Sequence, residues 1–200
     1  MPVPLEPVTL AGHHVRLEPL SLDHVDGLAA AAAIDRTTYG LSPVPEGVDG
    51  ARAFVETAIT GHAAGAFLPF AQLDARTGRI VGSTRYLDIQ YWTGGDTPNA
   101  VEIGSTWLAA DAQRTGINTE AKFLLLRYAF DELGVWRVQI CTDARNQRSR
   151  AAIERIGATL EGILRNFRVE SDTGGPRQTA VFSIIADEWP QVGERLRARL

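Results

Sequence analysis

Apolar and polar residues follow two distinct patterns along the first half of the chain. Runs that alternate with a period of two are typical of strands, and runs whose apolar residues recur every three or four positions are typical of helices. These patterns predict a strand at 8–18, helices at 22–34 and 48–62, and strands at 66–74, 80–90 and 100–109. Gly78, which lies between two of these strands, predicts a hairpin turn.

The second half of the chain carries clearer signals for helix ends. A loop at 110–117 should precede a helix at 118–133, with Asn118 or Thr119 as its N-cap and Gly134 just beyond its end. The remaining predicted elements are a strand at 135–142, a helix at 146–156 between the N-cap Asn146 and Gly157, strands at 158–170 and 177–186, and a short amphipathic segment at 187–200. This order predicts a mixed α/β fold with one central sheet, as a single domain over residues 1–200.

Composition narrows the class of protein. The 200 residues are 44% hydrophobic and 22% charged with a net charge of −4, which is ordinary for a globular domain. The 20 basic residues include one lysine, Lys122, and because Ala121 precedes it the chain has no Walker A phosphate loop. The single cysteine, Cys141, excludes a disulfide framework and cysteine-rich metal sites, and the four histidines have no metal-ligand spacing.

Signals for nucleic acid, membrane or export are also missing from the sequence. Mild acidity without a basic block argues against nucleic-acid binding. No apolar run reaches the roughly 18–20 residues of a membrane span, and the first residues have neither the charged nor the apolar region of a signal peptide. We therefore expect a cytoplasmic protein that binds neither nucleic acid nor membrane.

Two loops that lead into helices are candidates for chemistry. The loop Gln113–Asn118 follows a strand and opens a helix, where free backbone N–H groups can bind an anion, where Gly116 permits close approach and where Arg114 adds charge. The alternative is that this loop simply connects the strand to the helix and binds no ligand. Asn146 and Ser149 stand at the start of the next helix and are candidate site residues. The alternative is that Asn146 only caps this helix and that Ser149 is an ordinary residue of its first turn. A G-x-G-x-x-G dinucleotide motif is missing after the first strand.

Four segments of the second half carry a family resemblance. They are QRTGIN at 113–118, GINTEAKFLLLRYAF at 116–130, RVQICTDARNQRSRAAIERIGA at 137–158 and EWP at 188–190. With Glu161-Gly162 and Arg165 between them, they resemble the GNAT superfamily of N-acetyltransferases, in the branch of the ribosomal-protein N-terminal acetyltransferases (RimJ/RimL-like). Asn118 is one departure, since it stands where the superfamily pattern has glycine or alanine.

The resemblance implies a GNAT fold, with helices flanking a mostly antiparallel sheet whose fourth and fifth strands splay apart and hold acetyl-CoA. The pantetheine arm would lie along Leu108 and Ala109 and accept a hydrogen bond from Asn146, with Ser149 near the sulfur. The residues expected around the pyrophosphate are Gln113, Arg114, Thr115, Gly116, Ile117, Asn118 and Thr119.

The same resemblance suggests a mechanism in which a neutral amine attacks the thioester directly. Ser149 is the expected general acid for the leaving thiolate. Glu102 is the expected base, directly or through a water; equally, Glu102 could form a salt bridge to an arginine of a neighbouring strand, such as Arg85. A backbone N–H near Leu108 would stabilise the oxyanion. Strict alternation along this strand would place Thr106 on the same face as Glu102.

Aromatic and basic side chains outside the phosphate loop are candidates for the acceptor pocket. The candidates are Tyr39, Arg85, Tyr91, Trp92, Phe167 and Arg168. Their arginines could engage a carboxylate on the acceptor. Cys141 would lie near the CoA sulfur, either as a small buried residue or as a partner in a mixed disulfide. Lys122 would be either solvated or near a CoA phosphate, and a solvated side chain is the expectation.

These observations favour an acetyl-CoA-dependent N-acetyltransferase. Its acceptor would be a primary amine, either a protein N-terminal α-amine or the amine of a small molecule. Two alternatives are a CoA-binding regulatory module without catalysis and a transferase of a longer acyl group such as succinyl. The resemblance is also compatible with a homodimer.

Overall fold

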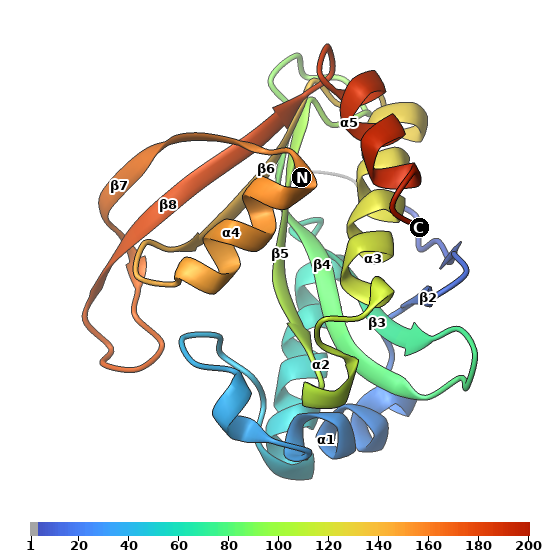
Figure 1. Cartoon of the computed structure of the whole chain (residues 1–200), viewed down its shortest axis with the longest axis vertical. Helices are drawn as coiled ribbons and strands as arrows, with labels where there is room; N and C mark the ends of the chain where they lie inside the picture. The colour runs from blue at the N-terminus through green and yellow to red at the C-terminus, as the bar shows by residue number, and fades with distance from the viewer. Residues whose placement is uncertain (1–3) are drawn as a thin grey trace.

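Within the described residues, 4–200, the computed structural model contains one eight-stranded sheet (Figure 1). Its strands are β1 (Leu10–Ala11), β2 (Val15–Pro19), β3 (Leu68–Asp74), β4 (Ile80–Gln90), β5 (Ala100–Leu108), β6 (Arg137–Asp143), β7 (Thr159–Val169) and β8 (Pro176–Ile185). Their order across the sheet is β1-β2-β3-β4-β5-β6-β8-β7. Neighbouring strands are antiparallel except β5 and β6, which run parallel. The expected mixed, mostly antiparallel sheet is thus confirmed.

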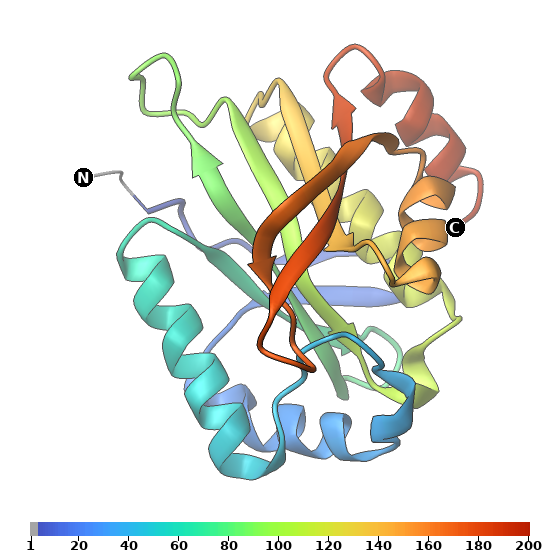
Figure 2. The same cartoon turned by 90° about the vertical axis from the view of Figure 1, so that its left-hand side faces the viewer.

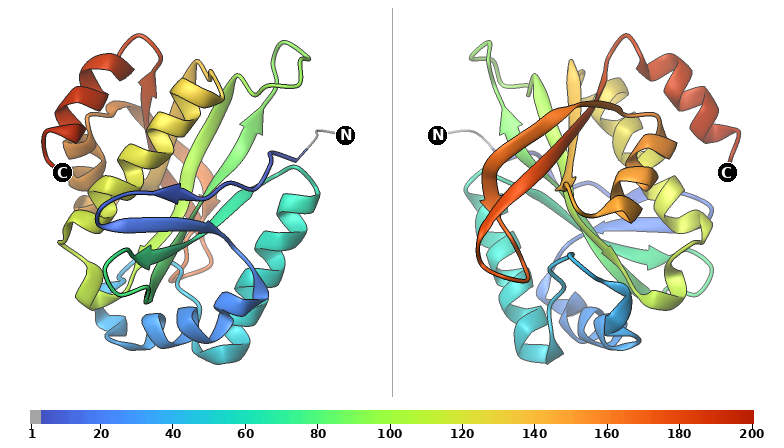
Figure 3. Two further views of the ribbon diagram at one scale, coloured as in Figure 1. Left: turned by 90° about the vertical axis from the view of Figure 1, so that its right-hand side faces the viewer. Right: turned by 60° about the vertical axis from the view of Figure 1, so that its left-hand side comes forward.

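Helices cover both faces of this sheet. They are α1 (Val25–Ala33), α2 (Gly47–Ala63), α3 (Gly116–Arg127, continued by a π-helical turn at Tyr128–Glu132), α4 (Gln147–Ile156) and α5 (Trp189–Arg197), with short 3-10 turns at Leu22–His24, Arg36–Thr38 and Ala110–Ala112. On β4, Arg85 contacts Phe54 of α2, whereas the next residue, Tyr86, donates its hydroxyl hydrogen bond to the Leu125 carbonyl of α3. Helices α2 and α3 therefore cover opposite faces, and α3 lies behind the strands in Figure 2 and in front of them in the left panel of Figure 3.

The structure corrects the expected boundaries in two places. The predicted strand at 8–18 is broken by a turn into β1 and β2. Helix α3 begins at Gly116, because Thr115 has an extended backbone and its hydroxyl accepts the Ile117 N–H at 3.3 Å. Asn118 and Thr119 consequently lie inside the first turn and are not the N-cap. The predicted cap Asn146 and the predicted stop Gly157 of α4 are both confirmed.

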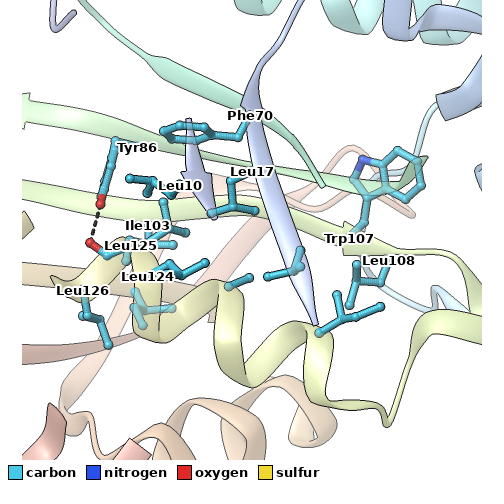
Figure 4. Close-up of a cluster of buried hydrophobic side chains, with 14 of the residues drawn as sticks. Leu10, Leu17, Phe70, Tyr86, Ile103, Trp107, Leu108, Leu124, Leu125 and Leu126 are labelled. Atoms are coloured by element: carbon cyan, nitrogen blue, oxygen red, sulfur yellow. Dashed lines mark hydrogen bonds between the residues drawn. The ribbon is translucent and has the colours of Figure 1, made fainter. Parts of the chain in front are cut away.

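An apolar layer fixes α3 on the sheet (Figure 4). Leu17, Phe70, Tyr86 and Ile103 are completely buried there against leucines of α3, such as Leu125. The rings of Phe70 and Tyr86 meet edge to face, with their centres 6.1 Å apart. Each such side chain contributes about 1.5–3 kcal/mol on burial, so this layer holds the start of α3 in a defined place beside β5.

One buried carboxylate adds a polar link between α3 and the first hairpin. Glu120 is 4% exposed and accepts the backbone N–H groups of His13, His14 and Val15 at 2.8, 2.5 and 2.8 Å. Gly12 makes room for it, since a Cβ at Gly12 would come within 2.3 Å of the Glu120 carboxyl carbon. The turn between β1 and β2 is therefore built around a side chain that is more than 100 residues away in the sequence.

We expect Glu120→Gln to lower the free energy of unfolding by about 3 kcal/mol, because an amide cannot accept all three N–H groups and turns its own donors toward them. Urea unfolding measures this loss. The matched control is Glu132→Gln, at an exposed position beyond α3, which should change stability by less than about 0.5 kcal/mol. Equal effects of the two substitutions would contradict this role of Glu120.

Candidate active site

The sheet opens between β5 and β6. Their parallel pairing covers only three pairs and ends at Glu102 and Gln139. Beyond that point β6 continues along β8 as far as Asp143, while β5 follows β4 in another direction. A cavity of about 980 Å³ lies at this parting, with walls from β5, β6, α3, α4 and the segment 39–43. The expected splay of the fourth and fifth predicted strands is confirmed.

A β-bulge in β5 changes which side chains face each side of the opening. Ser83 pairs with Trp107 and Arg85 pairs with Gly104, so that Ser105 and Thr106 together oppose one residue of β4. Ser105 has a φ of +51°, as a bulge requires. Strict alternation therefore fails here. Thr106 lies on the α3 face, where it hydrogen-bonds Lys122 of α3, and not on the Glu102 face as predicted.

The start of α3 forms the end of the cavity that suits an anion. The first N–H groups of a helix lack intrahelical acceptors, and Arg114, with a φ of +60°, turns the chain just before the helix. The predicted loop residues that line the cavity are Gln113, Arg114, Thr115, Asn118 and Thr119. Gly116 instead packs against His14, since a Cβ there would lie 2.7 Å from the His14 ring, and Ile117 is buried in the core.

A hydrogen-bond network joins this loop to α4. The Gln113 amide donates to the Leu108 carbonyl at 3.0 Å and to the Thr38 hydroxyl at 3.1 Å. Arg148 of α4 donates to the Thr38 carbonyl at 2.6 Å. Leu108 lines the cavity, whereas Ala109 is completely buried with its N–H bonded to Val81. The loop is thus held in shape by side chains from three parts of the chain.

The start of α4 brings Asn146 and Ser149 to the same cavity. The Asn146 side-chain oxygen accepts the Ser149 backbone N–H at 3.0 Å, which caps the helix. The capping bond uses the backbone of Ser149 and leaves its hydroxyl available to the cavity. The prediction that Asn146 caps this helix is confirmed, and the capping bond uses its side-chain oxygen and not its amide N–H groups.

Glu102 lies at the other side of the opening and is only 1% exposed. The Arg168 guanidinium of β7 donates hydrogen bonds to both Glu102 carboxylate oxygens at 3.0 and 2.6 Å. Gln139 donates to one of these oxygens at 3.2 Å. The alternative prediction that Glu102 forms a salt bridge with an arginine is therefore confirmed, but this arginine is Arg168 and not Arg85. The sequence could not predict that Glu102 pairs with a residue of β7. Two strands, β6 and β8, separate β7 from β5 in the sheet, and Arg168 reaches Glu102 only in the folded chain.

Arg85 is a buried cation without a counter-charge. Its guanidinium lies 4.9 Å from the ring centres of both Phe54 and Phe67, and the residue is 6% exposed. Among residues 4–200 no carboxylate lies within 4.0 Å of it, and its Nε has no hydrogen-bond partner. Burial lowers the pKa of Arg85 to about 10. Since Arg85 lines the cavity, it is placed to meet an anion there.

Lys122 also lines the cavity, and the expectation of a solvated side chain is wrong. The residue is 5% exposed, and its ammonium donates to the Thr106 hydroxyl at 2.8 Å. Burial lowers the pKa of Lys122 to about 7. The usable signal in the sequence is spacing, because Lys122 lies three residues after Thr119 and so falls on the same helix face.

The other acceptor candidates divide into two groups. Tyr39 lines the cavity and packs edge to face on Trp107 at 6.2 Å. Tyr91, Trp92 and Phe167 lie outside its wall. Trp92 packs on the ring of Trp136 at 6.1 Å, and Phe167 is half exposed on β7. Of the six predicted acceptor residues, the structure brings Tyr39, Arg85 and Arg168 together.

Within residues 4–200, no three His, Cys, Asp or Glu side chains converge as a metal site. The same residues contain no helix that is both long and apolar enough to cross a bilayer.

Cys141 of β6 lines the cavity beside Glu102. Burial raises the pKa of its thiol to about 12, and the Glu102 charge and a hydrogen bond to Glu102 act in the same direction. We expect alkylation of Cys141 by iodoacetamide at pH 8 to be at least about tenfold slower in the native protein than in the urea-unfolded chain, because the thiolate is the reactive form. Mass spectrometry follows the reaction, and equal rates would contradict a protonated thiol.

Comparison with known proteins agrees with this geometry. The sequence profile described as "Acetyltransferase (GNAT) domain" matches residues 14–159. A segment of 88 residues is 39% identical to the Bacillus subtilis (strain 168) protein named "Putative ribosomal N-acetyltransferase YdaF". That match covers 44% of this chain and 46% of the relative, so it spans less than half of each protein.

Solved structures extend the likeness over almost the whole chain. A GCN5-related N-acetyltransferase from Brucella melitensis is 31% identical and superposes with a TM-score of 0.84, covering 98% of this chain and 88% of that one. RimJ of Mycobacterium smegmatis, in complex with CoA-disulfide, has a TM-score of 0.80 over 96% of this chain and 95% of that one. At 22% identity that second likeness shows the fold alone. The profile match covers more than half of the chain, and the protein therefore belongs to the GNAT acetyltransferase family.

Proposed function

We propose that the protein is an acetyl-CoA-dependent N-acetyltransferase that transfers the acetyl group directly to a primary amine in a ternary complex. The observation that carries this proposal is the cavity between β5 and β6, which has an anion-binding helix start at one end and the carboxylate of Glu102 at the other. Family membership supports the acetyl group. The ribosomal name of one relative supports a protein N-terminal α-amine as acceptor, with a small-molecule amine as the alternative.

The α3 side of the cavity suits acetyl-CoA in both charge and hydrogen-bonding groups. The free N–H groups at the start of α3, together with Arg114, would bind the pyrophosphate. Asn146 would donate its amide N–H to a pantetheine carbonyl, since its oxygen already caps α4. The Leu108 carbonyl is bonded to Gln113, so β5 would offer the pantetheine arm its other backbone groups.

Each catalytic step can be assigned to a group on the cavity wall. Glu102 would take the proton that the acceptor nitrogen loses, directly or through a water. A weak base is sufficient for this step, because an amine that has attacked the thioester carries a positive charge. A backbone N–H of β5 near Leu108 would stabilise the oxyanion. The Ser149 hydroxyl would relay a proton to the leaving sulfur.

The acceptor side favours an α-amine that carries a carboxylate nearby. An α-amine has a pKa of about 7.7–8.0, against about 10.4 for lysine, so much more of it is neutral and reactive at cellular pH. Arg85 has no counter-charge in the described chain and lies at this side of the cavity. We infer that it holds a carboxylate of the acceptor, such as an acidic side chain close to a peptide N-terminus.

The test of this function is CoA release from acetyl-CoA over a panel of amines that contains peptides, amino acids, polyamines and aminoglycosides. We expect saturable turnover with at least one class, and we expect Glu102→Gln and Ser149→Ala each to lower kcat by about 100-fold. Ser149→Ala leaves the helix cap intact, because the cap uses the backbone N–H. The matched control is Arg127→Gln, at an exposed position of α3.

Three outcomes would count against the proposal. CoA binding without turnover on any amine would favour the regulatory module. Faster transfer from succinyl-CoA than from acetyl-CoA would favour the longer acyl group. Unchanged kcat in both variants would remove Glu102 and Ser149 from the mechanism while leaving the activity itself in place.

Arg85→Met provides a separate prediction about the acceptor. We expect KM for a carboxylate-bearing acceptor to rise about 10- to 100-fold with little change in kcat, because one charge-assisted contact is lost. The same acceptor with its carboxylate converted to an amide should have similar KM values for wild type and variant. Steady-state kinetics measures both, and an equal rise in KM for the acid and the amide would refute carboxylate recognition.

A further inference from the structure

The only lysine of the chain is held inside the cavity by a row of hydroxyl groups. Lys122 Nζ donates to the Thr106 hydroxyl at 2.8 Å, and that hydroxyl is in turn 2.8 Å from the Thr84 hydroxyl on β4. Thr84 is completely buried. The bulge at Ser105 is what turns Thr106 toward α3. The position of Nζ is therefore determined by two strands as well as by its own helix.

No group in the described chain supplies a negative charge for this amine. Among residues 4–200, no carboxylate lies within 4.0 Å of Nζ, and Thr106 is its one hydrogen-bond partner. A buried ammonium without a counter-charge is costly, so burial favours the neutral amine. The pKa of Lys122 falls to about 7 for this reason. When the amine donates one N–H to the Thr106 hydroxyl, its nitrogen lone pair is left for another partner.

Lys122 lines the same cavity as the residues at both of its ends. Thr119, at the anion-binding end, is one helical turn before Lys122 on α3. Glu102, at the other end, is on the same strand as Thr106 and four residues before it. An acyl thioester whose phosphates bind at the start of α3 and whose acyl group faces Glu102 must pass between these points. Its carbonyl carbon would then come within reach of Nζ.

We propose that Lys122 is a site of self-acetylation, at which the enzyme transfers the acetyl group of bound acetyl-CoA to its own buried amine. This inference rests on the proposed function. The Nζ lone pair attacks the thioester carbon, so that a C–N bond forms and the C–S bond breaks. The electron pair of the C–S bond stays on sulfur, and the proton that Nζ loses passes to that sulfur. The products are Nζ-acetyl-Lys122 and CoA thiol.

Acetylation would also change the cavity. The product amide carries no positive charge at any pH, and it adds an acetyl group to the wall where the thioester acetyl would lie. Overfilling a packed site is destabilising, so the modified protein should bind acetyl-CoA at least about tenfold more weakly. Acetylation of Lys122 would thus lower the activity of the enzyme when acetyl-CoA is bound and no acceptor is present.

The experiment is intact-mass spectrometry of the full chain after incubation with acetyl-CoA alone, followed by peptide mapping. We expect one acetyl group on Lys122 of the folded wild type, formed at least about 100-fold faster than on the urea-unfolded chain, in which the lysine has its ordinary pKa. The Lys122→Met variant should gain none at this position. Mapping separates Lys122 from the N-terminal amine, which is the other amine of the chain.

Calorimetry with CoA separates failure of this inference from failure of the proposed function. CoA binding without acetyl-Lys122 would overturn self-acetylation and leave the transferase intact. Absence of CoA binding by the wild type would overturn both. Equal acetylation of the folded and unfolded chains would show ordinary chemical acetylation and would also overturn the proposal. The wild-type result is decisive by itself, so the test does not depend on whether Lys122→Met folds.

Discussion

The parting of β5 from β6 after the Glu102–Gln139 pair is the constraint on which the site depends. Backbone groups of a strand need partners. β6 pairs with β8 and β5 pairs with β4 along their outer edges, so beyond this point the edges that face each other have no strand partner. The edge of β5 from Gly104 onward is therefore left to a ligand. The bulge at Ser105 occurs within this same stretch, where only one neighbouring strand dictates the register.

A second constraint keeps the start of α3 at the opening. The apolar layer beneath α3 and the three N–H groups that bind Glu120 hold this helix against β2 and β4. The Gln113–Thr38–Arg148 network holds the loop before it. The end of the cavity at the start of α3 is thus held in place by contacts within the chain, and such preorganisation lowers the cost of ordering a site on binding.

The charges around the cavity differ in how they are compensated. Glu102 forms an ion pair with Arg168, whereas Arg85 and Lys122 have no carboxylate partner among residues 4–200. Arg85 and Lys122 lie on opposite faces of the sheet, beside α2 and in α3 respectively. A buried cation costs stability unless something pairs with it or neutralises it. The two sides of the opening are therefore chemically distinct, with the guanidinium of Arg85 on one and the amine of Lys122 on the other.

The order of elements and the caps of α4 could be predicted from the sequence, because hydrophobic period, capping residues and glycines act over a few neighbouring residues. The family resemblance pointed to the splayed strands and to most of the residues around the opening. Three features emerge from the packing of the folded chain: Arg168 and not Arg85 pairs with Glu102, Glu120 organises the first turn, and Lys122 is buried. These contacts join residues far apart in the chain, and the bulge shifts the faces of β5 by one residue, so no local pattern could reveal them.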